Sequence, residues 1–221
     1  MKIKRRIAIG DIHGCYALMV ELIENVIKFD ASGDELVFIG DYIDRGPDNV
    51  KVVGYADYLK KNNPERVVLL IGNHELLALN ALKTRMSNEI QLWFINGGNT
   101  TLINYGSFDN ALRQLIPFIG NLQYYYETTE CIFVHGGIPA GETLESAPLK
   151  SLLWDRSYDR YTGKLIVVGH TPHKKVTKYK NAVVIDTGAV YYGKLSAYDV
   201  LNDKVYEAYS PGFGKSVFEG R

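Results

Sequence analysis

The sequence predicts an α/β protein whose first third forms βαβ units around a parallel β-sheet. Three times before residue 86, a short apolar run ends in a polar loop containing glycine, and a stretch with helical periodicity follows. Strand-like runs that alternate with helices of this length are typical of parallel sheets. The second half is rich in further strand-like runs, so we expect central β-sheets flanked by helices.

The elements of the first third follow from apolar runs and helical spacing. Within the first predicted helix, Leu18, Leu22, Val26 and Phe29 recur at three- and four-residue intervals and form one apolar face. Asn62-Asn63-Pro64 ends the second predicted helix. The predicted strands cover residues 6–9, 36–39 and 67–71, and the predicted helices cover residues 15–29, 48–61 and 76–85.

The pattern is less regular between residues 87 and 120. Trp93 and Phe94 precede Asn96-Gly97-Gly98-Asn99, which indicates helices joined by a tight turn, with both aromatic rings in the core. Asn202-Asp203 separates the last two apolar runs and predicts a hairpin. The later predicted strands cover residues 122–126, 132–134, 165–168, 182–185, 195–200 and 205–209.

Length, composition and charge exclude several classes of protein. The 221 residues suit one domain, expected over residues 1–221, and 46% hydrophobic residues exclude a largely disordered chain. The 25 Lys and Arg balance 25 Asp and Glu, which argues against nucleic-acid or anionic-membrane partners. Cys15 and Cys131 form no disulfide framework, and no signal peptide or membrane span is recognisable. We therefore expect a cytoplasmic protein.

Five polar loops each follow an apolar run, and they contain four of the five histidines of the chain. The loops are Asp11-Ile12-His13, Asp41-x-x-Asp44-Arg45, Asn73-His74-Glu75, His135-Gly136-Gly137 and His170-Thr171. In open α/β sheets, ligands bind outside the carboxyl ends of the strands, so we expect the loops to converge there. Imidazole, carboxylate and carboxamide groups together suit a metal such as manganese, iron or zinc.

Each motif alone is weak evidence, because a Gly-Asp pair is usually a turn and a histidine after a strand is usually structural. Chance turns and structural histidines do not explain five such loops that all carry metal-ligand residues after a strand. The motifs include Gly10-Asp11-x-His13-Gly14, Gly40-Asp41-x-x-Asp44-Arg45-Gly46, Gly72-Asn73-His74-Glu75, His135-Gly136-Gly137 and Gly169-His170-Thr171. With Leu153-Trp154-x-Arg156, they make the chain resemble the PPP family of metallophosphoesterases, the serine/threonine protein phosphatases, and in particular its small bacterial and bacteriophage branch.

The resemblance implies a calcineurin-like metallophosphoesterase fold and a dinuclear metal site. Two divalent ions, with manganese expected and iron or zinc as alternatives, would hold the phosphate for in-line attack by a bridging hydroxide. The ligands of one ion would be Asp11, His13 and Asp41, and those of the other would be Asp41, Asn73, His135 and His170.

The resemblance also assigns the remaining site residues. His74 would be the general acid, and Asp44 would orient it. Arg45 would bind two phosphate oxygens through its guanidinium group, and Arg156 would be the second phosphate ligand, with Arg160 as the alternative. Glu75 is expected to support its loop.

Three functions remain open from the sequence. The first is a phosphatase of phosphoserine and phosphothreonine proteins, with phosphotyrosine as a further substrate. The second is a dinucleoside polyphosphate hydrolase, for which Tyr158 and Tyr161 near Arg156 could stack a base. The third, a scaffold that has lost its reaction, is disfavoured because every ligand and the general acid are present. We therefore expect a phosphatase whose partners are phosphorylated proteins.

Overall fold

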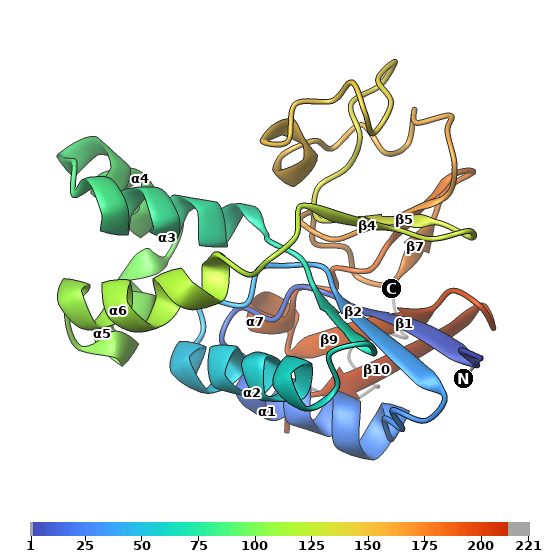
Figure 1. Cartoon of the computed structure of the whole chain (residues 1–221), viewed down its shortest axis with the longest axis horizontal. Coiled ribbons are helices and arrows are strands. Elements are labelled where there is room, and N and C mark those ends of the chain that lie inside the picture. Colours follow the sequence, from blue (N-terminus) through green and yellow to red (C-terminus); the bar gives the residue numbers. More distant parts are fainter. Residues whose placement is uncertain (1, 212–221) are drawn as a thin grey trace.

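The computed structural model describes residues 2–211, which form two five-stranded β-sheets with a shared apolar layer between them (Figure 1). The first sheet has the order β10-β9-β1-β2-β3, and the second has the order β4-β5-β6-β8-β7. This arrangement confirms the predicted α/β class with central sheets flanked by helices.

The first sheet contains the predicted βαβαβ start. Its parallel strands are β1 (Arg5–Ile9), β2 (Asp34–Phe38) and β3 (Val67–Leu69). On the side of β1 away from β2, the sheet continues with the antiparallel strands β9 (Lys194–Asp199) and β10 (Lys204–Tyr209). The predicted hairpin is therefore present.

The second sheet has three parallel central strands and an antiparallel strand at each edge. The central strands are β5 (Ile132–Val134), β6 (Ile166–Val168) and β8 (Ala182–Val184), and the edge strands are β4 (Tyr125–Glu127) and β7 (Thr177–Lys178). The strand predicted over residues 122–126 is shorter because the turn after α6 uses the N–H groups of Asn121 and Leu122.

Alternate residues of the strands face opposite apolar layers, which explains the unbroken apolar runs in the sequence. In β1, Ile7 and Ile9 pack with the helices, whereas Ala8 packs between the sheets. In β6, Ile166 faces the outer layer and Val167 faces the layer between the sheets. The central strands are thus buried on both faces, whereas the edge strands β4, β7 and β10 keep exposed residues.

Helices cover the outer face of the first sheet and form a projecting group beside it (Figure 1). Helix α1 (Tyr16–Val20) continues as the π-helical segment η1 (Glu21–Ile27), and it lies near α2 (Asn49–Asn62). The projecting group consists of α3 (Asn73–Thr84), α4 (Ser87–Ile95), α5 (Gly98–Tyr105) and α6 (Phe108–Ile119). A short 3₁₀ turn η2 (Ser151–Leu153) and helix α7 (Ala189–Tyr192) complete the elements. Among the described residues, no helix is both long and apolar enough to cross a membrane.

Candidate metal centre and active site

The predicted site residues lie in loops that follow five strands, and nine of the ten form one connected polar cluster. Asp11 and His13 follow β1, whereas Asp41, Asp44 and Arg45 follow β2. Asn73 and His74 begin α3 after β3, His135 follows β5, and His170 follows β6. Arg156 lies after η2, at the exposed margin of this cluster. The two sheets therefore both contribute to one site.

The backbone of the site is held in an uncommon conformation. Eight non-glycine residues in the described chain have positive φ, and five of them belong to the site. A positive φ is costly for residues with a Cβ atom and persists only where surrounding contacts enforce it, which often happens at functional sites. These five residues are His13, Asp41, Asp44, Arg45 and His170.

Two groups of potential metal ligands share Asp41. His13, Asp41 and His74 form one group, and Asp41, His135 and His170 form the other, with the ligand atoms in each group within 4.8 Å of one another. Asp41 Oδ2 is 3.4 Å from His13 Nε2, and Asp41 Oδ1 is 3.4 Å from His135 Nε2. The two carboxylate oxygens therefore face different groups, as a carboxylate between two cations requires.

Asn73 belongs to the second group by distance. Its Oδ1 lies 2.9 Å from His135 Nε2 and 2.8 Å from His170 Nδ1. Asp11 joins the cluster through Oδ2, which accepts a hydrogen bond of 2.9 Å from the His170 N–H. Its other oxygen, Oδ1, approaches the backbone at Gly169 so closely that a Cβ atom there would lie 2.1 Å away. Only glycine fits at that position.

The imidazoles of His13, His135 and His170 are held in the neutral form that a metal ligand requires. His13 Nδ1 donates to Ile43 O at 2.7 Å, and His135 Nδ1 donates to Ile39 O at 2.9 Å, so the Nε2 lone pairs face the site. Burial lowers the pKa of His13 and of His135, and burial together with His135 lowers the pKa of His170 to about 3. Neutral imidazole is the form that binds metals.

Two buried atoms of the cluster have no hydrogen-bond partner within the described chain, namely Asp11 Oδ1 and His170 Nε2. Burial and the neighbouring carboxylates of Asp186 and Asp41 raise the pKa of Asp11 well above its usual value. Divalent cations, one near each ligand group, would satisfy these two atoms and offset the repulsion between the carboxylates. The residues present therefore fit metal ions.

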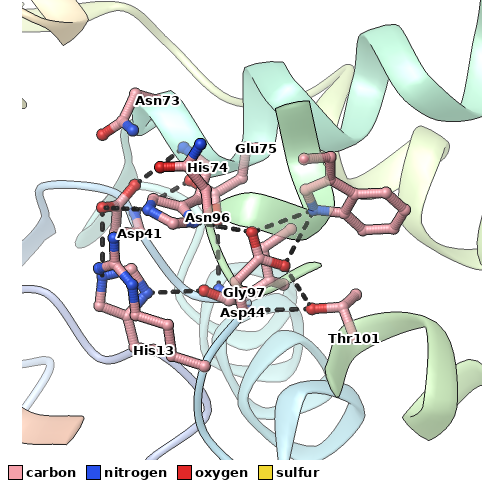
Figure 2. A network of polar contacts seen from close by, with 12 residues as sticks. His13, Asp41, Asp44, Asn73, His74, Glu75, Asn96, Gly97 and Thr101 are labelled. Atoms are coloured by element: carbon pink, nitrogen blue, oxygen red, sulfur yellow. Dashed lines mark hydrogen bonds and ion pairs between the residues drawn. The ribbon is translucent and has the colours of Figure 1, made fainter. Parts of the chain in front are cut away.

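His74 and Asp44 form a buried hydrogen-bonded pair beside the ligands. His74 Nδ1 donates to Asp44 Oδ2 at 2.7 Å, and His74 Nε2 lies 3.9 Å from Asp41 Oδ2 (Figure 2). Burial opposes the charged imidazole, but the carboxylates of Asp41 and Asp44 outweigh it and raise the pKa of His74. His74 is thus the one imidazole of the cluster whose charged form the surroundings favour.

The two predicted phosphate ligands are placed differently. Arg45 extends over the first ligand group, with its guanidinium 2.5 Å from His13 Nε2 and 5.5 Å from the ring centre of Tyr191. Arg156 is exposed, contacts the Thr171 hydroxyl at 3.5 Å, and its charge helps to lower the pKa of His135 and of His170. Arg160 instead lies beside Asp159. The geometry therefore favours Arg156 over Arg160.

Helix α3 begins at Asn73, three residues earlier than predicted, because Glu75 organises its first turn. The Glu75 carboxylate accepts from the N–H of Gly72 and of Asp41 through Oε2, and from Tyr42 and Ile43 through Oε1, at 2.8–3.3 Å. Glu75 is fully buried. It therefore fixes the loop after β2 against the start of α3.

We expect Glu75→Gln to lower the free energy of unfolding by about 2–4 kcal/mol. The amide NH₂ would face two buried backbone N–H groups and leave them without an acceptor. Urea denaturation in the presence of a chelator measures this loss without a contribution from metal binding. Glu65→Gln, the same change at an exposed residue in the turn before β3, should stay within about 0.5 kcal/mol of the wild type. Equal stabilities of the two variants would contradict this role of Glu75.

The sequence reasoning missed three side chains that complete the site. Trp93 and Thr101 both donate hydrogen bonds to Asp44, and Asp186 lies buried beside Asp11 with its pKa raised to about 7 by burial. Trp93 was expected only as a core residue, and it is fully buried. The available signal for Trp93 and Asp186 was their place in the motifs Trp93-Phe94-x-Asn96-Gly97-Gly98 and Ile185-Asp186-Thr187-Gly188-Ala189, but nothing in the sequence identified their partners.

The predicted stacking residues do not fit a base. Tyr158 is 7% exposed and Tyr161 is 8% exposed, because both rings pack into the outer apolar layer of the second sheet. The expectation that they could hold a nucleotide is therefore wrong. The exposed aromatic rings beside the cluster are Trp154, whose ring centre lies 5.7 Å from that of His170, and Tyr191 below Arg45.

Comparison with known proteins agrees with this geometry. The sequence profile of the calcineurin-like phosphoesterases matches residues 4–207, and the chain belongs to this family of metallophosphoesterases. It is 32% identical to serine/threonine-protein phosphatase 1 of Salmonella typhimurium, over 85% of this chain and 88% of that protein. This relative confirms the resemblance to bacterial serine/threonine phosphatases.

Other similar proteins are named as dinucleoside tetraphosphatases. The chain is 27% identical to the asymmetrical bis(5'-nucleosyl)-tetraphosphatase of Anoxybacillus flavithermus, over 86% of this chain and 87% of that protein. A crystal structure of a proposed diadenosine tetraphosphatase superposes with a TM-score of 0.72 at 20% identity and covers 94% of both chains. This superposition confirms the fold.

Proposed function

We propose that the protein is a metal-dependent phosphatase that hydrolyses phosphoserine and phosphothreonine in proteins. The observation that carries the proposal is the pair of ligand groups sharing Asp41, with the hydrogen-bonded His74 and Asp44 directly beside them. Burying an acid and its charged partner costs free energy. A scaffold without activity would have no need to keep such a pair in this geometry.

Two divalent ions would be held by seven ligand contributions from six residues. They would lower the pKa of a bound water and neutralise the phosphate oxygens during in-line attack. Manganese is the ion that we propose, because carboxylate, carboxamide and imidazole groups without thiolate suit it, with iron and zinc as alternatives. The ligands would be Asp11, His13 and Asp41 for one ion, and Asp41, Asn73, His135 and His170 for the other.

His74 would protonate the leaving oxygen of the ester. Its Nδ1–H is engaged with Asp44, which leaves the Nε2–H directed at the ligand groups, near Asp41. A positioned acid of this kind is most valuable for a serine or threonine ester, because an alkoxide is a poor leaving group. Asp44 would orient the imidazole and stabilise its charged form.

Arg45 and Arg156 would bind the phosphate oxygens from two sides of the site. The Arg45 guanidinium lies against the first ligand group, and the charge of Arg156 acts on the second. A guanidinium group can donate two parallel hydrogen bonds to a phosphate, so the two side chains would also fix its orientation.

The choice of substrate rests on the similarity to protein phosphatases and on the lack of a base-stacking surface at Tyr158 and Tyr161. The alternative is a dinucleoside polyphosphate hydrolase, favoured by the relatives of that name and by the exposed rings of Trp154 and Tyr191. Metals, acid and arginines serve an ester and an anhydride equally, so only the surroundings of the site distinguish the two.

We expect a phosphoserine peptide to be hydrolysed with a kcat/KM at least about tenfold above that for diadenosine tetraphosphate, which corresponds to ~1.4 kcal/mol at the transition state. Binding energy from a second nucleoside would need a surface that the buried tyrosines do not provide. Steady-state kinetics on both substrates at one manganese concentration test this. A tenfold preference for the dinucleotide would replace the phosphatase assignment by the alternative.

A further inference from the structure

The α4–α5 hairpin encloses the carboxylate of Asp44. Trp93 in α4 donates its indole N–H to both Asp44 oxygens at 3.0 Å, and the Thr101 hydroxyl in α5 donates to Oδ1 at 2.6 Å. Thr101 Oγ1 also accepts the backbone N–H of Asp44 at 2.9 Å. Figure 2 shows Asp44 between His74 on one side and Thr101 on the other.

The side chains of Asp44, Trp93 and Thr101 are all inaccessible to solvent, so no bulk water competes for the Asp44 carboxylate. Each carboxylate oxygen has protein donors: Oδ1 receives the hydroxyl and the indole N–H, and Oδ2 receives the indole N–H and His74. These hydrogen bonds hold the Asp44 carboxylate in a single position and orientation. Thr101 additionally restrains the backbone of Asp44, whose φ is 73°.

The hairpin is shaped for this contact. A Cβ atom at Gly98 would lie 2.4 Å from the indole of Trp93, so the first turn of α5 can approach the ring only because residue 98 is glycine. The ring also packs near Phe94 and Phe108, with ring centres 5.8 and 6.5 Å away. The indole N–H is thereby aimed at Asp44 by packing on the ring.

We propose that Trp93 and Thr101 are positioning residues of the reaction, which act through Asp44 to hold His74 in line with the leaving oxygen. This inference rests on the proposed function, because it requires His74 to be the general acid. Neither residue would touch substrate or metal. A misplacement of a reacting group by about 1 Å can cost as much as 10²-fold in rate, so removal of either donor should be visible in kcat.

The test uses Trp93→Phe, which keeps an aromatic ring and removes the indole N–H, in the full-length manganese-loaded enzyme. We expect kcat for a phosphoserine peptide to fall about tenfold with KM unchanged, and kcat for 2,4-dinitrophenyl phosphate to change less than about twofold. Dinitrophenolate leaves without a proton, so a misplaced general acid lowers kcat only for the peptide. An equal loss on both substrates would overturn the inference.

A double-mutant cycle with His74→Asn tests the route through His74. If Trp93 acts through the acid, Trp93→Phe in the His74→Asn background should lower kcat by less than about twofold further. A full tenfold loss in that background would overturn the inference. If instead His74→Asn alone shows no dependence on the leaving group, the assignment of His74 as the general acid in the proposed function fails, which is a distinguishable result.

Thr101→Val repeats the test at the second donor and does not depend on how Trp93→Phe folds. It should reproduce the selective loss on the peptide, and Thr101→Ser, which restores a hydroxyl, should recover most of kcat. Thr84→Val is the matched control, since its exposed hydroxyl donates to Asn80 O in α3 and accepts only from the Met86 N–H just after that helix. A Thr101→Val enzyme with the kcat of this control on the peptide would overturn the role of Thr101.

Discussion

Protein stripped of divalent cations is expected to lose its phosphatase activity completely and to regain it on addition of Mn²⁺. The physical reason lies in Asp11 Oδ1 and His170 Nε2, two buried polar atoms that have no partner among the described residues. Metal analysis should find two ions per chain. Mn²⁺ at about 100 times its dissociation constant should also stabilise the fold by ~2.7 kcal/mol per site, measurable by thermal unfolding independently of activity.

Asp41→Asn sharpens this experiment because Asp41 faces both ligand groups. The variant should lose the stabilisation by Mn²⁺ together with activity. Asp109→Asn, an equal change at an exposed carboxylate in α6, should retain both. Full activity of a sample that contains no metal would exclude a metal-dependent mechanism.

The position of the site could be predicted from the sequence because it depends on strand order and little else. Parallel strands have their carboxyl ends at one edge, so the polar loops after β1, β2 and β3 had to meet. The loops after β5 and β6 meet them because the second sheet packs on the first through residues such as Val167. Periodicity alone did not predict that the strands would divide between two sheets.

The partners of individual polar atoms could not be predicted in this way. Helical spacing placed Trp93 correctly in the core, but it does not tell which way the indole N–H points. That direction is set by contacts with Asp44 and Gly98, and Asp44 lies 49 residues away in the chain. The partner of Thr101 was even harder to predict, because the hydroxyl of a threonine in a helix usually bonds to the preceding turn or to water.

The burial of Tyr158 and Tyr161 shows a related limit. Both tyrosines lie in a segment with almost no regular structure, where no periodicity assigns a face to a side chain. Their rings fill the outer apolar layer of the second sheet. A sequence argument could place them near Arg156 along the chain, but only the packing shows that they are withdrawn from the site.

We expect His74→Asn to lower kcat by about 10²–10⁴ for esters with basic leaving groups, which is the usual contribution of a general acid. Asparagine can keep a hydrogen bond to Asp44, but it cannot carry a proton to the leaving oxygen. The loss should grow as the leaving group becomes more basic, from p-nitrophenyl phosphate to phenyl phosphate to a phosphoserine peptide. Steady-state kinetics over such a series, with metal content checked for each sample, measure the trend.

His173→Asn is the matched control, because its imidazole contacts the hydroxyls of Tyr158 and Thr177 and belongs to neither ligand group. It should leave the series unchanged. Asp44→Asn should reproduce the trend of His74→Asn with a smaller loss, since the imidazole remains and only its orientation and charge are disturbed. If His74→Asn lowers kcat by the same factor for every leaving group, proton transfer is not its contribution. His74 would then act on the metal ligands through Asp41, whose Oδ2 lies 3.9 Å from its Nε2.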